Sequence, residues 1–256
     1  MLEELDAIYY KDDDFTLLFG DCVSIMKKIQ DNTFDMIFAD PPYFLSKNGI
    51  TCSGGKMVSV NKAEWDMDKN VEQMHEFNHA WLSECKRILK PNGTIWISGT
   101  FHNIYSIGLA LQQLDYKLLN NITWYKKNAP PNLSCRYFTH STETILWAKK
   151  SKKSKHYYDY KLMKEINGGK QMRDVWEIPA INKKEKKHGD FPTQKPLALL
   201  ERIILASTKE GDKILDPFNG SGSTGIASIK LKRNYTGIDN VPEYLDLTLR
   251  RYNEIN

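Results

Sequence analysis

The stretch KILDPFNGSGST, residues 213–224, decides how this chain folds. Its first residues are apolar and strand-like, its centre is a turn with two glycines, and it leads into a predicted helix over 224–231. Glycine at a strand-to-helix turn permits positive φ and lets a ligand approach the backbone closely. A strand candidate over 235–238 follows and ends in Asp239. The segment therefore predicts one βαβ unit of an α/β protein.

Two acidic residues of this unit indicate what it binds. Asp239 follows the glycines by about twenty residues, where nucleoside-binding βαβ units place an acid that accepts hydrogen bonds from the ribose hydroxyls. Asp216 lies at the turn, where it would repel a pyrophosphate but suit an ammonium group. A ligand with a ribose and a cation but no phosphate points to S-adenosylmethionine rather than NAD. Asp216 therefore argues against a dinucleotide-dependent oxidoreductase. A tight turn followed by a surface acid is the purely structural alternative.

A second motif, Asp40-Pro41-Pro42-Tyr43, ends the apolar run 34–39. Each proline fixes φ at about −65° and lacks an N–H donor, so the local carbonyls stay free to accept. Asp40 and the Pro41 carbonyl can both accept from one exocyclic NH2, and Tyr43 offers a ring face for stacking. The motif alone also fits an ordinary strand exit. Beside a nucleoside-binding unit, it predicts a site for the amino group of a nucleobase.

The rest of the chain alternates strand-like and amphipathic helical segments. Strands are predicted over 16–19, 35–39, 94–98, 122–125, 144–148, 213–216 and 235–238, and helices over 22–29, 71–89, 104–114, 197–208, 224–231 and 242–253. This alternation predicts a doubly wound, mostly parallel α/β sheet of seven strands, covered by helices on both faces. Ligands of such sheets bind at the carboxyl ends of the strands. Those ends carry Asp21, Asp40, Ser98, Asp216 and Asp239.

The two motifs, in this order, resemble those of the β group of DNA amino-methyltransferases. In that group the Asp-Pro-Pro-Tyr motif precedes the cofactor motif, and the target-recognition region lies between them. The resemblance spans nearly the whole chain and is also carried by 18–22, 87–97, 121–126, 143–147 and 192–196. Ser223 stands where the family usually has threonine, which keeps the hydroxyl. A narrower likeness, carried by 135–147, is to the small adenine methyltransferases of GATC restriction-modification systems.

The resemblance implies a Rossmann-like methyltransferase domain formed by 1–126 and 190–256, with an inserted basic target-recognition region at 127–189. It implies transfer of a methyl group from S-adenosylmethionine to the N6 amino group of adenine in DNA, and the narrower likeness implies GATC as the target sequence. The base would be flipped out of the duplex or single-stranded, and the transfer would be direct and in line. The aspartate form of the tetrapeptide usually goes with adenine in this family. Methylation of cytosine N4, or of an RNA amino group, is the alternative.

The expected site residues fall into two groups. Asp40, Pro41, Pro42 and Tyr43 are expected to be catalytic. The cofactor residues lie at strand ends, in the glycine turn, or in the segment before the 197–208 helix, and are Asp21, Thr193, Lys195, Asp216, Phe218, Gly220, Ser221, Gly222, Ser223 and Asp239. The resemblance assigns Asp239 to the ribose, Asp21 to the adenine, and the turn with Lys195 to the methionine part. Lys195 also fits a plain surface position before a helix.

No metal site is expected, although HEFNH at residues 75–79 matches the His-Glu-x-x-His pattern of zinc proteases. No third ligand follows the pattern, so the two histidines are more simply explained as ordinary helix residues. The four cysteines, at 22, 52, 85 and 135, form no Cys-x-x-Cys pair. Their spacing is typical of a reducing compartment rather than of a disulfide framework.

The charge of the chain is unevenly distributed. The net charge is +4, but residues 149–190 contain thirteen lysines and arginines against six acids, a net charge of +7. Four aromatic residues, Tyr157, Tyr158, Tyr160 and Trp176, are interleaved with them. A basic segment with aromatic rings suits phosphates and unpaired bases, so it predicts a DNA partner, although a solvated lysine-rich insertion has the same composition. A non-catalytic DNA-binding module would leave the Asp-Pro-Pro-Tyr motif without a role.

The remaining composition sets the wider expectations. A chain of 256 residues with 41% hydrophobic residues can bury a substantial core. No stretch approaches the roughly eighteen apolar residues of a membrane span, and the acidic start MLEELD lacks a signal-peptide core. We therefore expect a cytoplasmic protein without a membrane partner. A homodimer is one assembly that the sequence allows. The glycine- and lysine-rich stretch 45–65 is predicted to be a long loop that closes over DNA.

Overall fold

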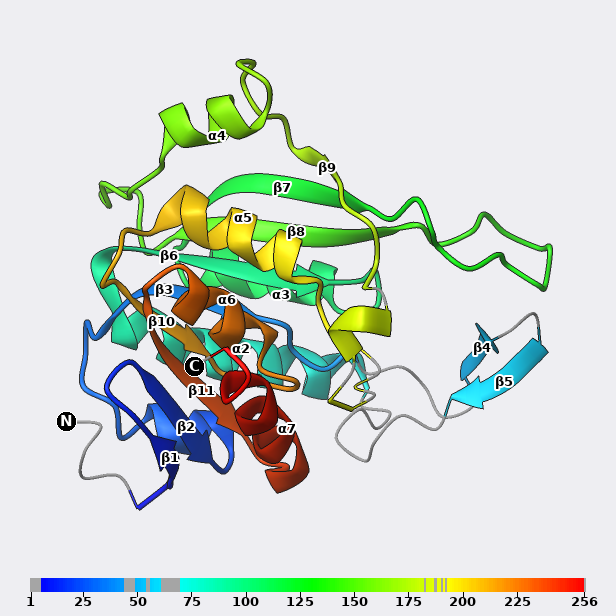
Figure 1. Ribbon diagram of the computed structural model, residues 1–256. Coiled ribbons are helices and arrows are strands. Elements are labelled where there is room, and N and C mark those ends of the chain that lie inside the picture. The colour runs from blue at the N-terminus through cyan, green and yellow to red at the C-terminus, as the bar shows by residue number, and fades with distance from the viewer. Residues whose placement is uncertain are drawn as a thin grey trace.

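The centre of the molecule is a nine-stranded sheet in the order β1-β2-β11-β10-β3-β6-β8-β7-β9 (Figure 1). The computed structural model describes residues 6–43, 49–53, 56–60, 70–181, 183–186, 188–189, 191 and 193–255. The strands of the sheet are β1 Ile8–Lys11, β2 Phe15–Phe19, β3 Phe34–Ala39, β6 Leu89–Gly99, β7 Lys117–Tyr125, β8 Thr142–Lys149, β9 Val175–Glu177, β10 Lys213–Asp216 and β11 Asn234–Asp239.

The sheet is mostly parallel, as predicted. Strands β2, β11, β10, β3 and β6 run in one direction, and β7 pairs in parallel with β9. Strand β8 is antiparallel to both of its neighbours, and β1 is antiparallel to β2. The seven predicted strands are the seven inner ones, but the predicted total of seven is wrong. The edge strands β1 and β9 were missed because they have only four and three residues and are mostly exposed, so neither carries an apolar run.

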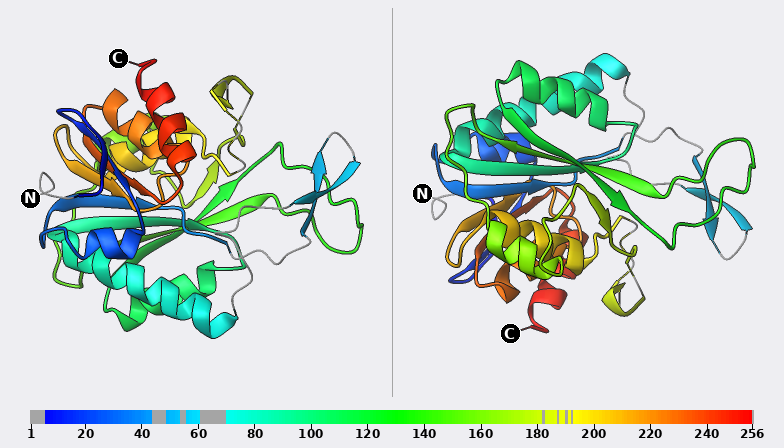
Figure 2. Two further views of the ribbon diagram at one scale, coloured as in Figure 1. Left: turned by 90° about the horizontal axis from the view of Figure 1, so that it is seen from below. Right: turned by 90° about the horizontal axis from the view of Figure 1, so that it is seen from above.

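Helices cover both faces of the sheet (Figure 2). One layer consists of α1 Cys22–Met26, α2 Val71–Ile88 and α3 Ile104–Gln113, and the other of α4 Tyr160–Ile166, α5 Leu197–Ser207, α6 Ser223–Lys230 and α7 Pro242–Tyr252. Each layer encloses its own core: Trp81 and Ile107 belong to the first, and Ile203 and Leu245 to the second. All of the predicted helices are present. Helix α4 was not predicted, because it buries only Met163.

A small hairpin stands apart from the main sheet. Strands β4 Gly49–Ser53 and β5 Lys56–Val60 pair antiparallel as a separate two-stranded sheet (Figure 1). The prediction of an irregular loop over 45–65 is therefore wrong for these two segments, whose strand alternation was hidden by a glycine-rich composition. Residues 44–48, 54–55 and 61–69 lie outside the described residues. Closure of this stretch over DNA stays a prediction.

The parallel arrangement brings the acids of both motifs to one edge. Strand β10 lies between β3 and β11, with Leu215 opposite Ile37 and Asp216 opposite Gly237. Asp40 directly follows β3, Asp216 ends β10 and Asp239 ends β11. Because the three strands point the same way, these carboxylates meet at the carboxyl edge of the sheet.

The turn between β10 and α6 depends on Gly222, which has φ +71°. A Cβ atom at Gly222 would lie 2.3 Å from Cγ2 of Thr248 in α7. We expect Gly222→Ala to lower the free energy of unfolding by about 3 kcal/mol, through left-handed strain and a clash. Urea unfolding measures the loss. Gly211→Ala is the control, because Gly211 has φ +82° with nothing within 4 Å of its Cβ position. Equal losses in the two variants would contradict a packing role for Gly222.

Candidate active site

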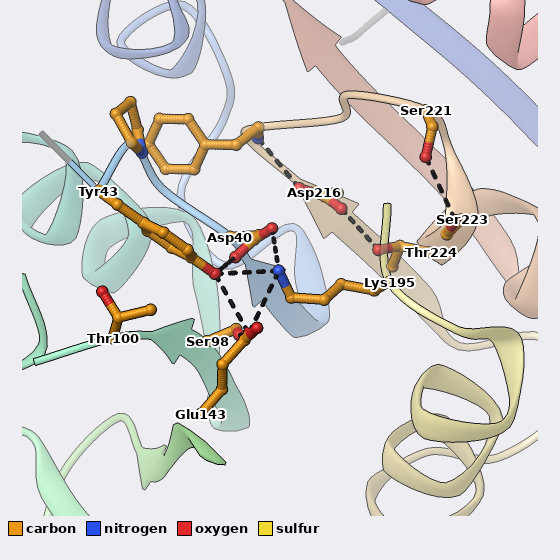
Figure 3. A network of polar contacts seen from close by, with 12 residues as sticks. Asp40, Tyr43, Ser98, Thr100, Glu143, Lys195, Asp216, Ser221, Ser223 and Thr224 are labelled. Atoms are coloured by element: carbon orange, nitrogen blue, oxygen red, sulfur yellow. Dashed lines mark hydrogen bonds and ion pairs between the residues drawn. The ribbon is translucent and has the colours of Figure 1, made fainter. Parts of the chain in front are cut away.

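Asp40 and Tyr43 lie together in a buried hydrogen-bond network with Lys195 (Figure 3). The Tyr43 hydroxyl donates to Asp40 Oδ1 at 2.7 Å. The Lys195 ammonium donates to Asp40 Oδ2 at 2.5 Å and to the Tyr43 hydroxyl at 3.0 Å. Lys195 is only 6% exposed, so the interpretation of Lys195 as a plain surface residue is wrong. Asp40 is thus held in place by both a ring hydroxyl and an ammonium.

The loop after β3 is anchored by Asn103, which the sequence did not single out. Asn103 is fully buried, donates through Nδ2 to the Pro42 carbonyl at 3.1 Å, and accepts from the Thr100 N–H at 3.2 Å. An asparagine before a helix looks like a cap, and its contact with Pro42 spans 61 residues. Only the tertiary structure reveals this contact.

Glu143 at the start of β8 extends the network. Its Oε1 accepts from the Lys126 ammonium at 2.9 Å. Its Oε2 lies 3.4 Å from both the Tyr43 hydroxyl and Ser98 Oγ, and 3.6 Å from Lys195 Nζ. Strands β7 and β8 were both predicted, but their register was not. This register sets Trp124 opposite Glu143 and so brings Lys126 close to Glu143.

The network mixes two acids and two lysines, and this sets their protonation. Burial raises the pKa of Asp40 above its ordinary value, and Lys195 opposes that rise only in part. For Glu143, burial also acts to raise the pKa, but Lys195 and Lys126 overcome it and lower the pKa. Burial acts to lower the pKa of Lys195, but Asp40 and Glu143 raise it. Lys195 therefore stays charged at neutral pH.

A cavity of about 330 Å³ opens beside Asp40, at the carboxyl ends of β2, β3, β10 and β11. Pro42 lines it together with Asp40. Nine of the ten expected cofactor residues line it as well: Asp21, Thr193, Lys195, Asp216, Phe218, Gly220, Ser221, Ser223 and Asp239. The tenth, Gly222, faces Thr248 instead and shapes the turn. Lining residues that the sequence did not single out include Phe77, Phe191, Asn240 and Tyr244.

Asp216 is held in the wall of this cavity by the glycine turn. It accepts from the Phe218 N–H at 3.0 Å and from the Thr224 hydroxyl at 2.6 Å (Figure 3). Asp216 is 2% exposed, and this burial raises its pKa to about 7.

Asp239, at the end of the neighbouring strand β11, is fixed by backbone N–H groups. It accepts from the Gly220 N–H at 2.7 Å and from the Val241 N–H at 3.0 Å, and burial raises its pKa to about 6. Asp21 caps α1 by accepting from the Ser24 N–H at 2.9 Å. With Asp40 and Asp216, these residues line the cavity with four carboxyl groups. The charge of the site therefore favours a cationic ligand.

A second, wider groove begins on the other side of Tyr43. Tyr43, Lys126 and Glu143 line it, as do Phe101 and Tyr105 at the start of α3. Residues 193–195 border both spaces. The Asp-Pro-Pro-Tyr motif thus separates a small acidic cavity from an open groove with aromatic walls.

The HEFNH segment is part of α2 and packs against α3. His75 makes contacts of 3.1 Å to Ser106 Oγ and 2.9 Å to Gln113 Oε1, so both of its ring nitrogens are engaged. Among the residues that the structure describes, no group of three or more His, Cys, Asp or Glu side chains is placed to hold a metal ion.

Residues 34–250 match the family model for DNA methylases. The chain belongs to the N6/N4 DNA methylase family. The methylase is 57% identical over 247 residues to the type II methyltransferase M2.LlaDCHI of Lactococcus lactis subsp. cremoris, covering 96% of this chain and 92% of that protein. It is 58% identical over 244 residues to M2.DpnII of Streptococcus pneumoniae, covering 95% and 91%.

Solved structures show the same fold. The complex of M1.HpyAVI with S-adenosylmethionine superposes on the methylase with a TM-score of 0.68 at 28% identity, covering 93% of this chain and 99% of that one. The cytosine-N4-specific PvuII DNA methyltransferase gives a TM-score of 0.74 at 16% identity, covering 95% and 88%, and shares the fold alone. The resemblance stated from the motifs is confirmed.

The methylase is an S-adenosylmethionine-dependent DNA methyltransferase. Its acidic cavity fits this cofactor, which carries a sulfonium and an ammonium, because buried carboxylates complement cations. Asp239 lines this cavity, and the expected contact of its carboxylate with the ribose diol stays a prediction. The expected contact between Lys195 and the methionine part stays a prediction, since the Lys195 ammonium points to Asp40 and Tyr43. None of the helices within the described residues is long and apolar enough to cross a bilayer.

Cofactor affinity should rise with pH. Asp216, with a pKa of about 7, and Asp239, with a pKa of about 6, are partly protonated in the free protein at pH 6. A cation binds best to the ionised carboxylates, so raising the pH from 5 to 8 should tighten S-adenosylmethionine binding at least about tenfold. Calorimetric titration in buffers of different ionisation enthalpy should detect protons released on binding near pH 6.5.

The control for this pH effect is Asp216→Asn, which removes the group with the higher pKa. The variant should bind the cofactor more weakly at pH 8, and its affinity should change less between pH 6.5 and 8. A pH dependence identical to that of the unsubstituted methylase would exclude titration of Asp216 as the cause.

Proposed function

We propose that this methyltransferase transfers a methyl group to the N6 amino nitrogen of adenine in DNA, within the sequence GATC of a restriction-modification system. The observation that carries the proposal is the position of Asp40 and Tyr43 at the border between the acidic cofactor cavity and the open groove. Three relatives with 54–58% identity are type II methyltransferases, which supports the restriction-modification setting. The likeness of 135–147 to the enzymes of GATC systems supports the target sequence.

The chemical task of Asp40 follows from the electronic structure of the substrate. The lone pair of an adenine amino group is delocalised into the ring, so the nitrogen is a poor nucleophile. Asp40 and the Pro41 carbonyl would each accept one N–H, which returns electron density to the nitrogen and directs its lone pair toward the cofactor cavity. Positioning and desolvation supply most of the rate gain.

The bound cofactor supplies an electrophilic methyl group on a sulfonium. The new N–C bond forms as the S–C bond breaks, and the nitrogen then releases one proton. Asp40 would accept a hydrogen bond from that nitrogen and could take the proton, because burial raises the pKa of Asp40. Tyr43 would stack on the adenine ring, and a base inside a duplex must leave the stack to reach it.

The DNA surface must lie at the carboxyl edge, and only part of the basic segment is there. Strand β8 begins at Thr142 beside the site and runs antiparallel to β6, so its end at Lys149 lies at the opposite edge (Figure 1). Lys150 donates there to the carbonyls of Arg87 and Leu89. Lys149 and Lys150, with which the basic segment 149–190 begins, therefore lie away from the site. Phosphate binding by the segment as a whole stays a prediction.

The target-recognition region stays proposed at 127–189, with the catalytic domain at 1–126 and 190–256. Within this region, β8 and β9 are built into the main sheet. Two parts lie at the carboxyl edge: the arm 127–141, which connects β7 to β8 and extends outward, and the turn of 3-10 helix Lys183–Lys186 (Figure 1). We assign DNA contact to these two parts. A homodimer and a cytoplasmic location stay predictions.

Methylation of defined oligonucleotides tests the proposal. The methylase is incubated with labelled S-adenosylmethionine and a GATC duplex, a duplex with the adenine replaced by purine (which lacks the amino group), or an RNA of the same sequence. Digestion to nucleosides and mass spectrometry identify the product. N6-methyladenine from the GATC duplex alone supports the proposal. N4-methylcytosine, or label in RNA only, would establish one of the alternatives instead.

A further inference from the structure

We propose that Glu143 is a positioning residue of the transfer reaction: a buried second counter-ion that takes the Lys195 ammonium when a substrate amino group docks on Asp40. No feature of the sequence motifs assigns a role to Glu143. The inference rests on the proposed function, because it requires that Asp40 accept a hydrogen bond from the target amine.

The starting observation is that one oxygen of a buried carboxylate, Oε2 of Glu143, makes only long polar contacts. Glu143 Oε1 is occupied by Lys126 at 2.9 Å. Around Oε2, Ser98 Oγ lies 3.4 Å away and Lys195 Nζ 3.6 Å away. The Tyr43 hydroxyl is also 3.4 Å away, but its one proton is donated to Asp40. Charge-assisted hydrogen bonds are normally about 2.7–2.9 Å long. Oε2 therefore has the capacity to accept a close cation.

The second observation is that Asp40 is occupied on both oxygens. Tyr43 donates to Oδ1, and Lys195 donates to Oδ2 at 2.5 Å. A carboxylate paired this closely with an ammonium is a weaker acceptor for a neutral NH2 group. If the ammonium withdraws, Oδ2 is free to accept from the amine with its full charge. The chain therefore needs a second place for the Lys195 ammonium during the reaction.

Glu143 supplies that place at small cost. Moving Lys195 Nζ from 3.6 Å to about 2.8 Å from Oε2 needs a shift of only about 0.8 Å. An ammonium left without a carboxylate in this buried site would lose its pairing and be strongly disfavoured. The two carboxylates and two ammonium groups of the network sum to zero charge in both arrangements. The shift thus changes which acid holds the lysine without placing an unpaired charge in the core.

The charged groups around Glu143 allow its positioning role to be tested by the pH dependence of the transfer rate. Lys126 on β7, Lys195 before α5, and Asp40 and Tyr43 after β3 are the titratable groups that face Glu143. The negative charge of Glu143 raises the pKa of Asp40. Removing that charge should lower the pKa of Asp40, so the acid limb of the rate profile should move to lower pH.

The test is single-turnover methyl transfer from pH 5 to 9 with the GATC duplex, for the unsubstituted methylase and Glu143→Gln. We expect the plateau rate of the variant to fall about 10- to 100-fold, as for loss of a positioning contact, with the acid limb displaced to lower pH. Its affinity for S-adenosylmethionine should stay within about twofold, because Glu143 does not line the cofactor cavity. A slow variant whose acid limb has not moved would overturn the proposal, because that is the result of structural damage alone.

Two further variants keep the test decisive. Glu210→Gln is the matched control: Glu210 also lies 3.6 Å from a lysine, Lys232, but on the surface, and its removal should change neither rate nor profile. Glu143→Asp keeps the charge, so it should return the acid limb to the pH of the unsubstituted methylase and recover part of the rate. An acid limb that does not return counts against the proposal. This comparison remains available if Glu143→Gln does not fold. If the unsubstituted methylase gives no N6-methyladenine, the proposed function is wrong. The reaction of the unsubstituted methylase therefore distinguishes failure of the proposed function from failure of the inference about Glu143.

Discussion

Asp40→Asn should reduce the rate of methyl transfer by about a thousandfold, the scale seen when a group that stabilises a developing charge is removed. The asparagine keeps the volume of Asp40 but loses its charge and one of its two acceptor oxygens. The Tyr43 hydroxyl and the Lys195 ammonium, which now bond to the two oxygens of Asp40, compete for the one that is left. The target amine then has no anionic acceptor.

Two measurements separate this chemical loss from a loss of fold or cofactor. The single-turnover rate reports the chemical step, and calorimetry should give a cofactor dissociation constant within about threefold of the original. Asp35→Asn is the control, because Asp35 lies on β3, the strand that Asp40 follows, and also pairs with a lysine, Lys90, at 2.7 Å. The control should keep its transfer rate. If Asp40→Asn retained more than a tenth of the rate, Asp40 would not be the acceptor.

Asp239→Asn should weaken S-adenosylmethionine binding by about a hundredfold or more, which corresponds to about 3 kcal/mol for lost charge-assisted hydrogen bonds. Asp239 accepts from the backbone of Gly220 and Val241 with one lone pair on each oxygen. Asp239 also lines the cavity, where its carboxylate oxygens suit the two hydroxyls of a ribose. An amide in this position presents a donor to groups that are themselves donors.

Equilibrium binding of labelled cofactor checks this result, with the transfer rate measured at saturating cofactor. Because Asp239 does not touch the Asp40 network in the part of the chain that the structure describes, the saturated rate should fall less than tenfold. Asp246→Asn is the control, since Asp246 is an exposed acid on α7 that pairs with Tyr9. Unchanged cofactor affinity in Asp239→Asn would move the ribose contact to another residue.

Much of the fold was readable from local sequence because each signal is contained in one segment. Apolar runs predicted the seven inner strands, including 34–39 before Asp40, and the glycine turn after Asp216 predicted the βαβ unit. The edge strand β9 and helix α4 carried no such signal, because each buries one side chain: Trp176 and Met163 respectively. Their formation depends on the surface against which they pack.

The candidate site divides in the same way. Sequence alone placed Asp40, Asp216 and Asp239 at the ends of parallel strands. Turn chemistry and strand periodicity are local properties of the chain, so this could be predicted. Three features required the folded chain: Lys195 pairs with Asp40, and Glu143 lies 3.6 Å from the Lys195 ammonium. The third is that Lys150, after β8, lies at the edge of the sheet opposite the site. Those facts depend on strand order, direction and register, which arise from contacts between residues far apart in the chain, and no local pattern encodes them.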